Sequence, residues 1–175
     1  DLSVDQFVDT LNATEKHIDF LLNLVGSRLG LDNDRVLGGR GAFAALSWYV
    51  HKVGGYIGNH AEQQKALYWY LHCLMWGRYS SSVESMLQRD LDAFEANGID
   101  GAIEELQKWR GDLTVRTSDF EWSTVGARFY PVLYMLTRRR GSRDLCSGIE
   151  LTQSLLGKSS KLHLHHIFPK ALLYK

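Results

Sequence analysis

The chain has 175 residues, of which 45% are hydrophobic and 23% charged, with a formal net charge of zero and only two prolines. These values exclude a disordered or low-complexity chain and are typical of one compact, mostly helical domain with a buried core. A balanced total charge excludes no class of partner, because a nucleic-acid partner needs only one basic face.

The first half of the chain contains three apolar patterns with helical spacing. Apolar residues recur at three- and four-residue steps from Ala13 to Leu29, which predicts an amphipathic helix closed by Gly30. An apolar-rich segment from Gly41 to Val53 predicts a second helix, which a pair of glycines ends. The stretch from Asn59 to Arg78 predicts a third helix, strongly buried.

The next helix carries signals at both ends. Ser81 and Glu84 have the spacing of a capping box, which predicts a helix from Val83 to Ala96. Asn97 and Gly98 are typical of a helix C-terminus and predict that the helix stops there.

The remaining segments are shorter. We expect a helix from Asp100 to Arg110 and an irregular or briefly extended segment from Leu113 to Glu121. A further helix is predicted from Val125 to Arg140, bent by Pro131. Residues Leu145 to Leu156 are compatible with one or two last helical turns.

The sequence as a whole predicts an all-α fold. We expect a single bundle of about six helices over residues 1–160, followed in residues 161–175 by a short extended segment, a turn and the start of a helix. Helical spacing places the large aromatic residues in the core, in preference to a base-stacking platform. These residues are Trp48, Tyr68, Trp69, Tyr70, Trp76 and Tyr79.

Cysteine usage and hydropathy suggest a compartment. Cys73 and Cys146 are not spaced as a disulfide framework or a zinc knuckle, so a reducing, cytoplasmic setting is expected. The longest apolar stretch, from Gly41 to Val50, is far shorter than the roughly 20 residues that cross a bilayer, so no membrane partner is expected. The chain begins without Met, and we interpret it as part of a longer protein.

Three histidines near the C-terminus carry the candidate chemistry. His163, His165 and His166 fall within four positions, and neighbouring side chains of an extended segment point to opposite sides. One imidazole can then hold a metal ion while its neighbour takes a proton from water, as phosphodiester hydrolysis requires. The alternative is that adjacent histidines merely decorate the surface.

Charge is distributed unevenly along the chain. Residues 1–122 contain 11 Lys and Arg against 18 Asp and Glu, whereas residues 123–175 contain 9 against 2. The densest basic cluster comprises Arg138, Arg139, Arg140 and Arg143, and Lys158, Lys161 and Lys170 extend it toward the histidines. Such residues suit contacts to DNA phosphates. A basic run that only complements a helix dipole, followed by a basic tail, explains the same pattern.

The segment HHIFP, followed by KALLYK, resembles the opening of an HNH nuclease motif. The strings GRGAFAALSWYV, YWYLHCLMWGRYSSSVESMLQRDL and RFYPVLYMLTRRRGSRDLCSGIEL resemble the helical region that precedes this motif in the GmrSD-type restriction endonuclease family. The resemblance covers essentially the whole chain, and HHIFP is its most specific part.

The resemblance implies roles for single residues. His165 corresponds to a metal ligand and His166 to the general base, whereas His163 matches no required position and is assigned a supporting place beside the metal site. The implied cofactor is a divalent metal ion, Mg or Mn, and the implied substrate is double-stranded DNA that is foreign or modified. Members also carry an N-terminal ParB-like nucleotide-binding domain, which this chain lacks.

The chain departs from the family pattern at its end. The HNH motif continues to an asparagine and a further metal ligand, and the sequence stops at Lys175 before either. This fragment alone is therefore expected to bind metal weakly and to be inactive. A rival interpretation is a non-catalytic helical adaptor or DNA-binding region with a degenerate HNH remnant.

Overall fold

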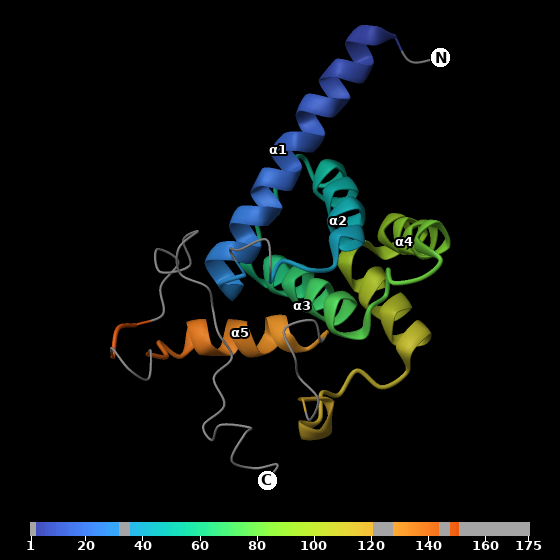
Figure 1. The fold of residues 1–175 in the computed structure, drawn as a ribbon. Coiled ribbons are helices and arrows are strands. Elements are labelled where there is room, and N and C mark those ends of the chain that lie inside the picture. The colour runs from blue at the N-terminus through green and yellow to red at the C-terminus, as the bar shows by residue number, and fades with distance from the viewer. Residues whose placement is uncertain (1–2, 32–35, 121–127, 144–147, 151–175) are drawn as a thin grey trace.

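A computed structural model describes residues 3–31, 36–120, 128–143 and 148–150 of the chain (Figure 1). Within these ranges the fold is helical, as the sequence predicts, and pairing between extended residues is limited to one isolated bridge between Arg143 and Glu150. The helices are α1 (Val4–Leu29), α2 (Arg40–Lys52), α3 (His60–Trp76), α4 (Val83–Arg110), the 3-10 helix η1 (Thr117–Phe120) and α5 (Tyr130–Arg139).

Helix α1 begins nine residues earlier than the predicted start at Ala13. Ser3 and Gln6 form a capping box in which the Ser3 hydroxyl accepts from the Gln6 backbone N–H and the Gln6 side chain accepts from the Ser3 backbone N–H. Gly30, at φ 71°, ends the helix as predicted. The first half of α1 projects away from the other helices, because the bundle is shorter than this helix (Figure 1).

Helix α2 is the centre of the bundle and contacts α1, α3 and α4. Five of its apolar side chains, from Ala42, Phe43, Ala45, Leu46 and Val50, are buried together with Tyr49. Helix α3 buries Trp69 and Tyr70 completely, and the Trp69 indole N–H donates to the Ala102 carbonyl oxygen of α4 at 3.1 Å. The prediction of two apolar, buried helices in this half of the chain is confirmed.

Helix α4 joins the two helices that the sequence predicts on either side of Asn97 and Gly98. Both residues leave helical geometry, with φ −150° at Asn97 and φ 55° at Gly98, so the chain bends sharply there without a loop. The predicted Ser81–Glu84 capping box is wrong. Ser82 is the N-cap, at φ 50°, and its side chain makes no capping hydrogen bond.

The predicted bend of a helix at Pro131 is wrong. The helix starts at Tyr130, so Pro131 lies in the first turn, where the missing N–H costs no helical hydrogen bond. Tyr130, Val132 and Tyr134 are buried against the bundle. Residues 121–127, which include the predicted start at Val125, lie outside the described part of the chain.

Most of the large aromatic residues belong to the core, as predicted. Trp69 packs edge-on against Phe94 with a centroid distance of 5.3 Å, and Phe94 stacks on Tyr49 at 4.9 Å. Tyr68 is the exception, because it is 41% exposed and lines a pocket beside α3. Among the helices whose placement is described, none combines the length and apolarity that crossing a membrane requires.

Candidate functional site

The predicted HNH segment lies outside the described residues. His163, His165 and His166, together with Lys161 and Lys170, fall in residues 151–175, whose placement the structure does not describe. Their roles as metal ligand, general base and DNA contacts therefore stay predictions. Of the helical turns predicted from Leu145 to Leu156, only residues 148–150 are described, and these are not helical.

The arginine cluster at the end of α5 lies within the described residues, and its members differ in exposure to solvent. Arg139, Arg140 and Arg143 are exposed. Arg138 is half-buried against α1, where a Cβ atom placed on Gly30 would lie 3.1 Å from the Arg138 Cβ. Arg138 is therefore part of the packing between α5 and α1, and the surface of this cluster consists of the other three arginines.

A turn directly after α5 separates Arg139 and Arg140 from Arg143. The Gly141 N–H donates to the Arg138 carbonyl and the Ser142 N–H to the Thr137 carbonyl, so the chain reverses directly after the helix. The backbone bridge between Arg143 and Glu150 continues this reversal. From residue 128 to 143 the chain contains five arginines and no acidic residue. The reversal does place one carboxylate, that of Glu150, near the turn.

Two further arginines surround the end of α3, and the sequence pattern does not single them out. The Arg110 guanidinium lies 4.3 Å from the centroid of the Trp76 ring, and Arg128 donates to the Trp76 carbonyl oxygen at 3.4 Å. Both arginines are exposed. Since they come from α4 and from the segment before α5, only the tertiary fold brings them together, and no local pattern could have identified the pair.

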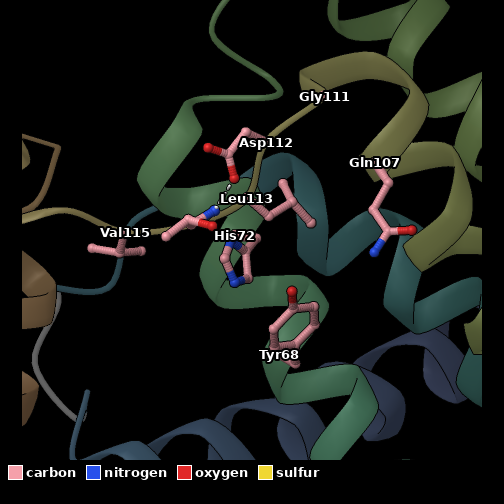
Figure 2. Close-up of a pocket in the computed structure, with 8 residues that line it drawn as sticks. Tyr68, His72, Gln107, Gly111, Asp112, Leu113 and Val115 are labelled. Atoms are coloured by element: carbon pink, nitrogen blue, oxygen red, sulfur yellow. Dashed lines mark hydrogen bonds between the residues drawn. The ribbon is translucent and has the colours of Figure 1, made fainter.

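A pocket of about 500 Å³ lies between α3 and the segment that follows α4 (Figure 2). His72 is buried in its wall, and its Nδ1 accepts a hydrogen bond from the Trp76 indole at 3.1 Å. The proton of the neutral ring is therefore on Nε2. Burial lowers the pKa of His72, so the ring is a neutral hydrogen-bond donor at pH 7.

The rest of the pocket lining is mixed: Leu113 and Val115 are apolar, and some of its polar groups already make contacts within the protein. The Tyr68 ring lies 4.3 Å from His72, measured between centroids, and the Gln107 amide lies on the opposite wall. Asp112 accepts from the Thr114 N–H at 2.8 Å, and hydrogen bonds from Thr114 lower the pKa of the Asp112 carboxyl. The pocket suits a small polar molecule. Within the described ranges, no group of three or more His, Cys, Asp or Glu side chains is placed to hold a metal ion.

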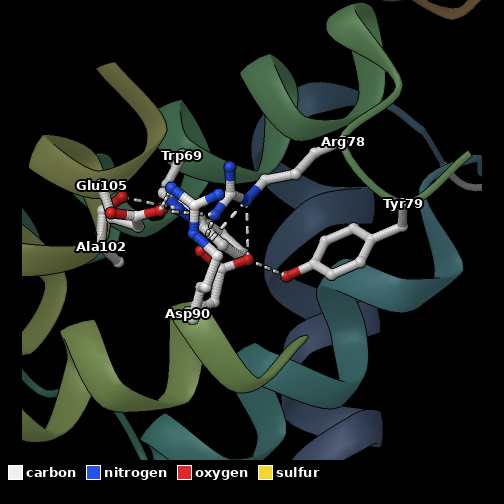
Figure 3. Close-up of polar contacts among 7 residues, drawn as sticks. Trp69, Arg78, Tyr79, Asp90, Ala102 and Glu105 are labelled. Atoms are coloured by element: carbon white, nitrogen blue, oxygen red, sulfur yellow. Dashed lines mark hydrogen bonds and ion pairs between the residues drawn. The ribbon is translucent and has the colours of Figure 1, made fainter. Parts of the chain in front are cut away.

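Arg78 and Asp90 form a buried ion pair between the end of α3 and the middle of the first part of α4 (Figure 3). The Arg78 Nε and Nη2 atoms donate to the Asp90 carboxylate at 2.7 to 3.1 Å, and the Tyr79 hydroxyl also donates to it. Burial and the Asp90 charge raise the pKa of Tyr79 above its usual range. Glu105 joins the pair to Arg89 at 2.6 Å.

The charge of Arg78 is not available at the surface. Arg78 is 1% exposed, and its charge is neutralised by Asp90. The network holds α3 against α4 and is structural.

Comparison of the chain with protein-family models, with curated proteins and with solved structures gives no significant match. The assignment of function therefore depends on the residues themselves.

Proposed function

We propose that this chain is the helical part of a metal-dependent DNA endonuclease of the HNH type, acting on foreign or modified DNA. The observation that carries the proposal is the HHIFP segment, His165 to Pro169, with its adjacent imidazoles followed by a proline. In this proposal His166 removes a proton from the attacking water and His165 is a metal ligand. A bound divalent cation would stabilise the charge that develops on the phosphate.

The arginines at the end of α5 support a contact with the DNA backbone. Arg139, Arg140 and Arg143 are exposed, lie around a turn and precede His163 by 20 to 24 residues in the sequence. Guanidinium groups pair well with phosphate oxygens, and such contacts carry no sequence preference. We propose that this surface holds the duplex while the HNH segment reaches a phosphodiester.

The DNA contact is tested by changing Arg139, Arg140 and Arg143 together to Ala. Affinity for a duplex of arbitrary sequence should fall, and the slope of log K against log salt should become less negative by about 0.9 for each phosphate that the variant no longer neutralises. Arg138 is left in place because it packs on Gly30. Fluorescence anisotropy at several salt concentrations measures both quantities.

The matched control changes three exposed lysines on other helices, Lys16, Lys52 and Lys65, to Ala. This variant loses the same charge but should keep most of the affinity and the salt slope of the parent chain. Equal losses of affinity in both variants would show that DNA binding depends only on the total charge of the chain. An unaltered affinity in the arginine variant would contradict the proposed interface.

Metal dependence is a separate test of the same proposal. The intact protein should nick plasmid DNA with Mg²⁺ or Mn²⁺ and stop when the metal is chelated. Cleavage by the intact protein that survives complete chelation would contradict the proposed chemistry.

A further inference from the structure

Two histidines from different helices lie side by side where α1 packs on α2. The ring centroids of His17 and His51 are 5.5 Å apart, and the ring planes are inclined by 53°. His17 is the first buried residue of α1 and is 7% exposed, whereas His51 lies in the last turn of α2 and is exposed. Since the two residues are far apart in the sequence, only the packing of the helices brings the rings together.

The protein leaves the nitrogen atoms of both rings unused. No hydrogen bond or ion pair joins either ring to another residue in the part of the chain that the structure describes. The Nε2 atom of His17 faces the turn that follows α2, where a Cβ placed on Gly55 would lie 3.9 Å from it. Buried polar groups in proteins nearly always have a partner, so a partner for His17 has to come from the space beside the ring.

That space is a groove of about 500 Å³ between α1 and α2, which both histidines line. Its α2 wall includes the apolar rings of Phe43 and Trp48. Arg40 also lines the groove, but it begins α2, and the helical rise places its backbone about 16 Å from that of His51. The two imidazoles are therefore open to a space that can hold an ion with its water molecules.

The separation of the rings fits joint coordination of one metal ion. An imidazole nitrogen binds Zn²⁺ at about 2.0–2.1 Å, which places the ion about 3 Å from the ring centroid. The centroids of two such rings at a tetrahedral angle are about 5 Å apart, close to the 5.5 Å between His17 and His51. Neutral imidazole suits Zn²⁺, Ni²⁺ and Cu²⁺, whereas Mg²⁺ and Ca²⁺ prefer oxygen ligands.

We propose that His17 and His51 form a two-histidine site for a divalent transition-metal ion, namely Zn²⁺, Ni²⁺ or Cu²⁺. Each helix supplies one ligand, and water in the groove completes the coordination. Because α1 projects from the bundle before His17, the ion holds this helix at the point where it leaves the other helices. The site is separate from the proposed nuclease metal, for which His165 is the ligand and Mg or Mn the expected ion, so it does not depend on the proposed function.

Isothermal titration calorimetry of the 175-residue chain at pH 7.5 tests the proposal with ZnCl₂, NiCl₂ and MgCl₂. His163, His165 and His166 would bind the same transition metals, so a chain in which all three are changed to Ala is the reference. The reference chain should bind one Zn²⁺ or Ni²⁺ ion with a dissociation constant on the order of 10 µM, and should not bind Mg²⁺.

Variants of the reference chain test both ligands. His51 is exposed, so His51→Ala should keep the fold while it weakens Zn²⁺ binding at least about tenfold. His17→Gln should weaken binding to a similar extent. His60→Ala removes an exposed histidine at the start of α3 and should bind Zn²⁺ like the reference chain. Circular dichroism checks that all three variants keep the helix content of the reference chain.

Two further measurements show whether one ion bridges the helices. Electron paramagnetic resonance of bound Cu²⁺ should show two imidazole nitrogens in the reference chain and at most one in His51→Ala. About 1 mM Zn²⁺ should raise the thermal midpoint of the reference chain by about 5 °C, because the ion binds the folded chain in preference to the unfolded one. The midpoint of His51→Ala should change much less.

Three results would overturn the proposal. They are a reference chain that binds no Zn²⁺ or Ni²⁺ at about 1 mM, binding that either His51→Ala or His17→Gln leaves intact, and a loss in His60→Ala as large as that in His51→Ala. None of these results depends on DNA cleavage by the intact protein, so a failure here is distinguishable from a failure of the proposed function.

Discussion

Asp90 carries a negative charge at a position that is fully buried, between Arg78 and the Tyr79 hydroxyl. Removing one partner of a buried ion pair leaves the other charge without compensation, which costs about 3–5 kcal/mol. Asp90→Ala should therefore lower the free energy of unfolding by that amount in urea denaturation. A loss below about 1 kcal/mol would show that water replaces the carboxylate.

The control for this variant lies on the same helix. Glu95 pairs with Lys52 at 3.0 Å on the surface, where its side chain is 60% exposed. Solvent screens such a pair, so Glu95→Ala should cost at most about 1 kcal/mol. The difference between the two variants measures how burial changes the value of one carboxylate.

Two histidines link stability to pH. Burial lowers the pKa of His72, and burial together with the nearby charge of His51 lowers the pKa of His17, both from an ordinary value of 6.5. Below pH 6.5 both histidines become protonated in the unfolded chain, whereas in the folded chain they become protonated only at lower pH. The contribution of these two residues to the free energy of unfolding should therefore be nearly constant above about pH 7 and fall as the pH decreases from about 6.5.

Denaturation at pH 7.5, 6.5 and 5.5 checks this expectation. His72→Gln removes one of the two groups, so its stability should depend less on pH across this range than that of the parent chain. Asp112, whose pKa is lowered, affects stability only at more acidic pH, below its ordinary value of 3.8. A stability that rises on acidification through pH 6 would contradict the assignment.

The sequence predicted some single residues well and others badly. His72 lies in the stretch from Asn59 to Arg78 that the sequence predicts to be a strongly buried helix, and it is buried. Arg78 could not be placed in the core from its neighbours, since its partner Asp90 lies 12 residues away on another helix. Buried charge pairs depend on tertiary contacts, which no local pattern encodes.

At the scale of elements, the residues Asn97 and Gly98 in α4, which predict the end of a helix, produce a bend instead of a loop. Asn97 and Gly98 do leave helical geometry, but helix resumes at once, because Gly101 lets the two parts approach closely. A Cβ on Gly101 would lie 2.4 Å from the Ala93 carbonyl oxygen, on the other side of the bend. Composition predicts the interruption, whereas this close approach depends on the fold.

Gly101→Ala should therefore strain the bend and lower the free energy of unfolding by about 1–3 kcal/mol. Gly58→Ala is a suitable control, because the added Cβ would meet only the outer edge of the Tyr56 ring, at 3.1 Å. Thermal or urea denaturation of both variants measures the difference. Equal stability of Gly101→Ala and the parent would show that the bend relaxes without cost.

At the scale of the whole molecule, the helical class followed from apolar spacing, but the extent of α1 did not. The apolar residues in the first turns of α1 have no core against which to pack. The prediction assumed one bundle that buries the apolar face of every helix, and it therefore started this helix only at Ala13. The arginine cluster was identified from its density, yet burial of Arg138 separates it from its exposed neighbours. The histidine segment stays a prediction from residue type and order.

The role of the paired histidines is tested most directly by plasmid cleavage with the intact protein and Mg²⁺ or Mn²⁺. His166→Ala should lower the cleavage rate by about 10²–10⁴, the usual contribution of a general base. His163→Ala, three residues earlier on the same segment, should change the rate only a few-fold. Cutting by His166→Ala at the parent rate would contradict the account.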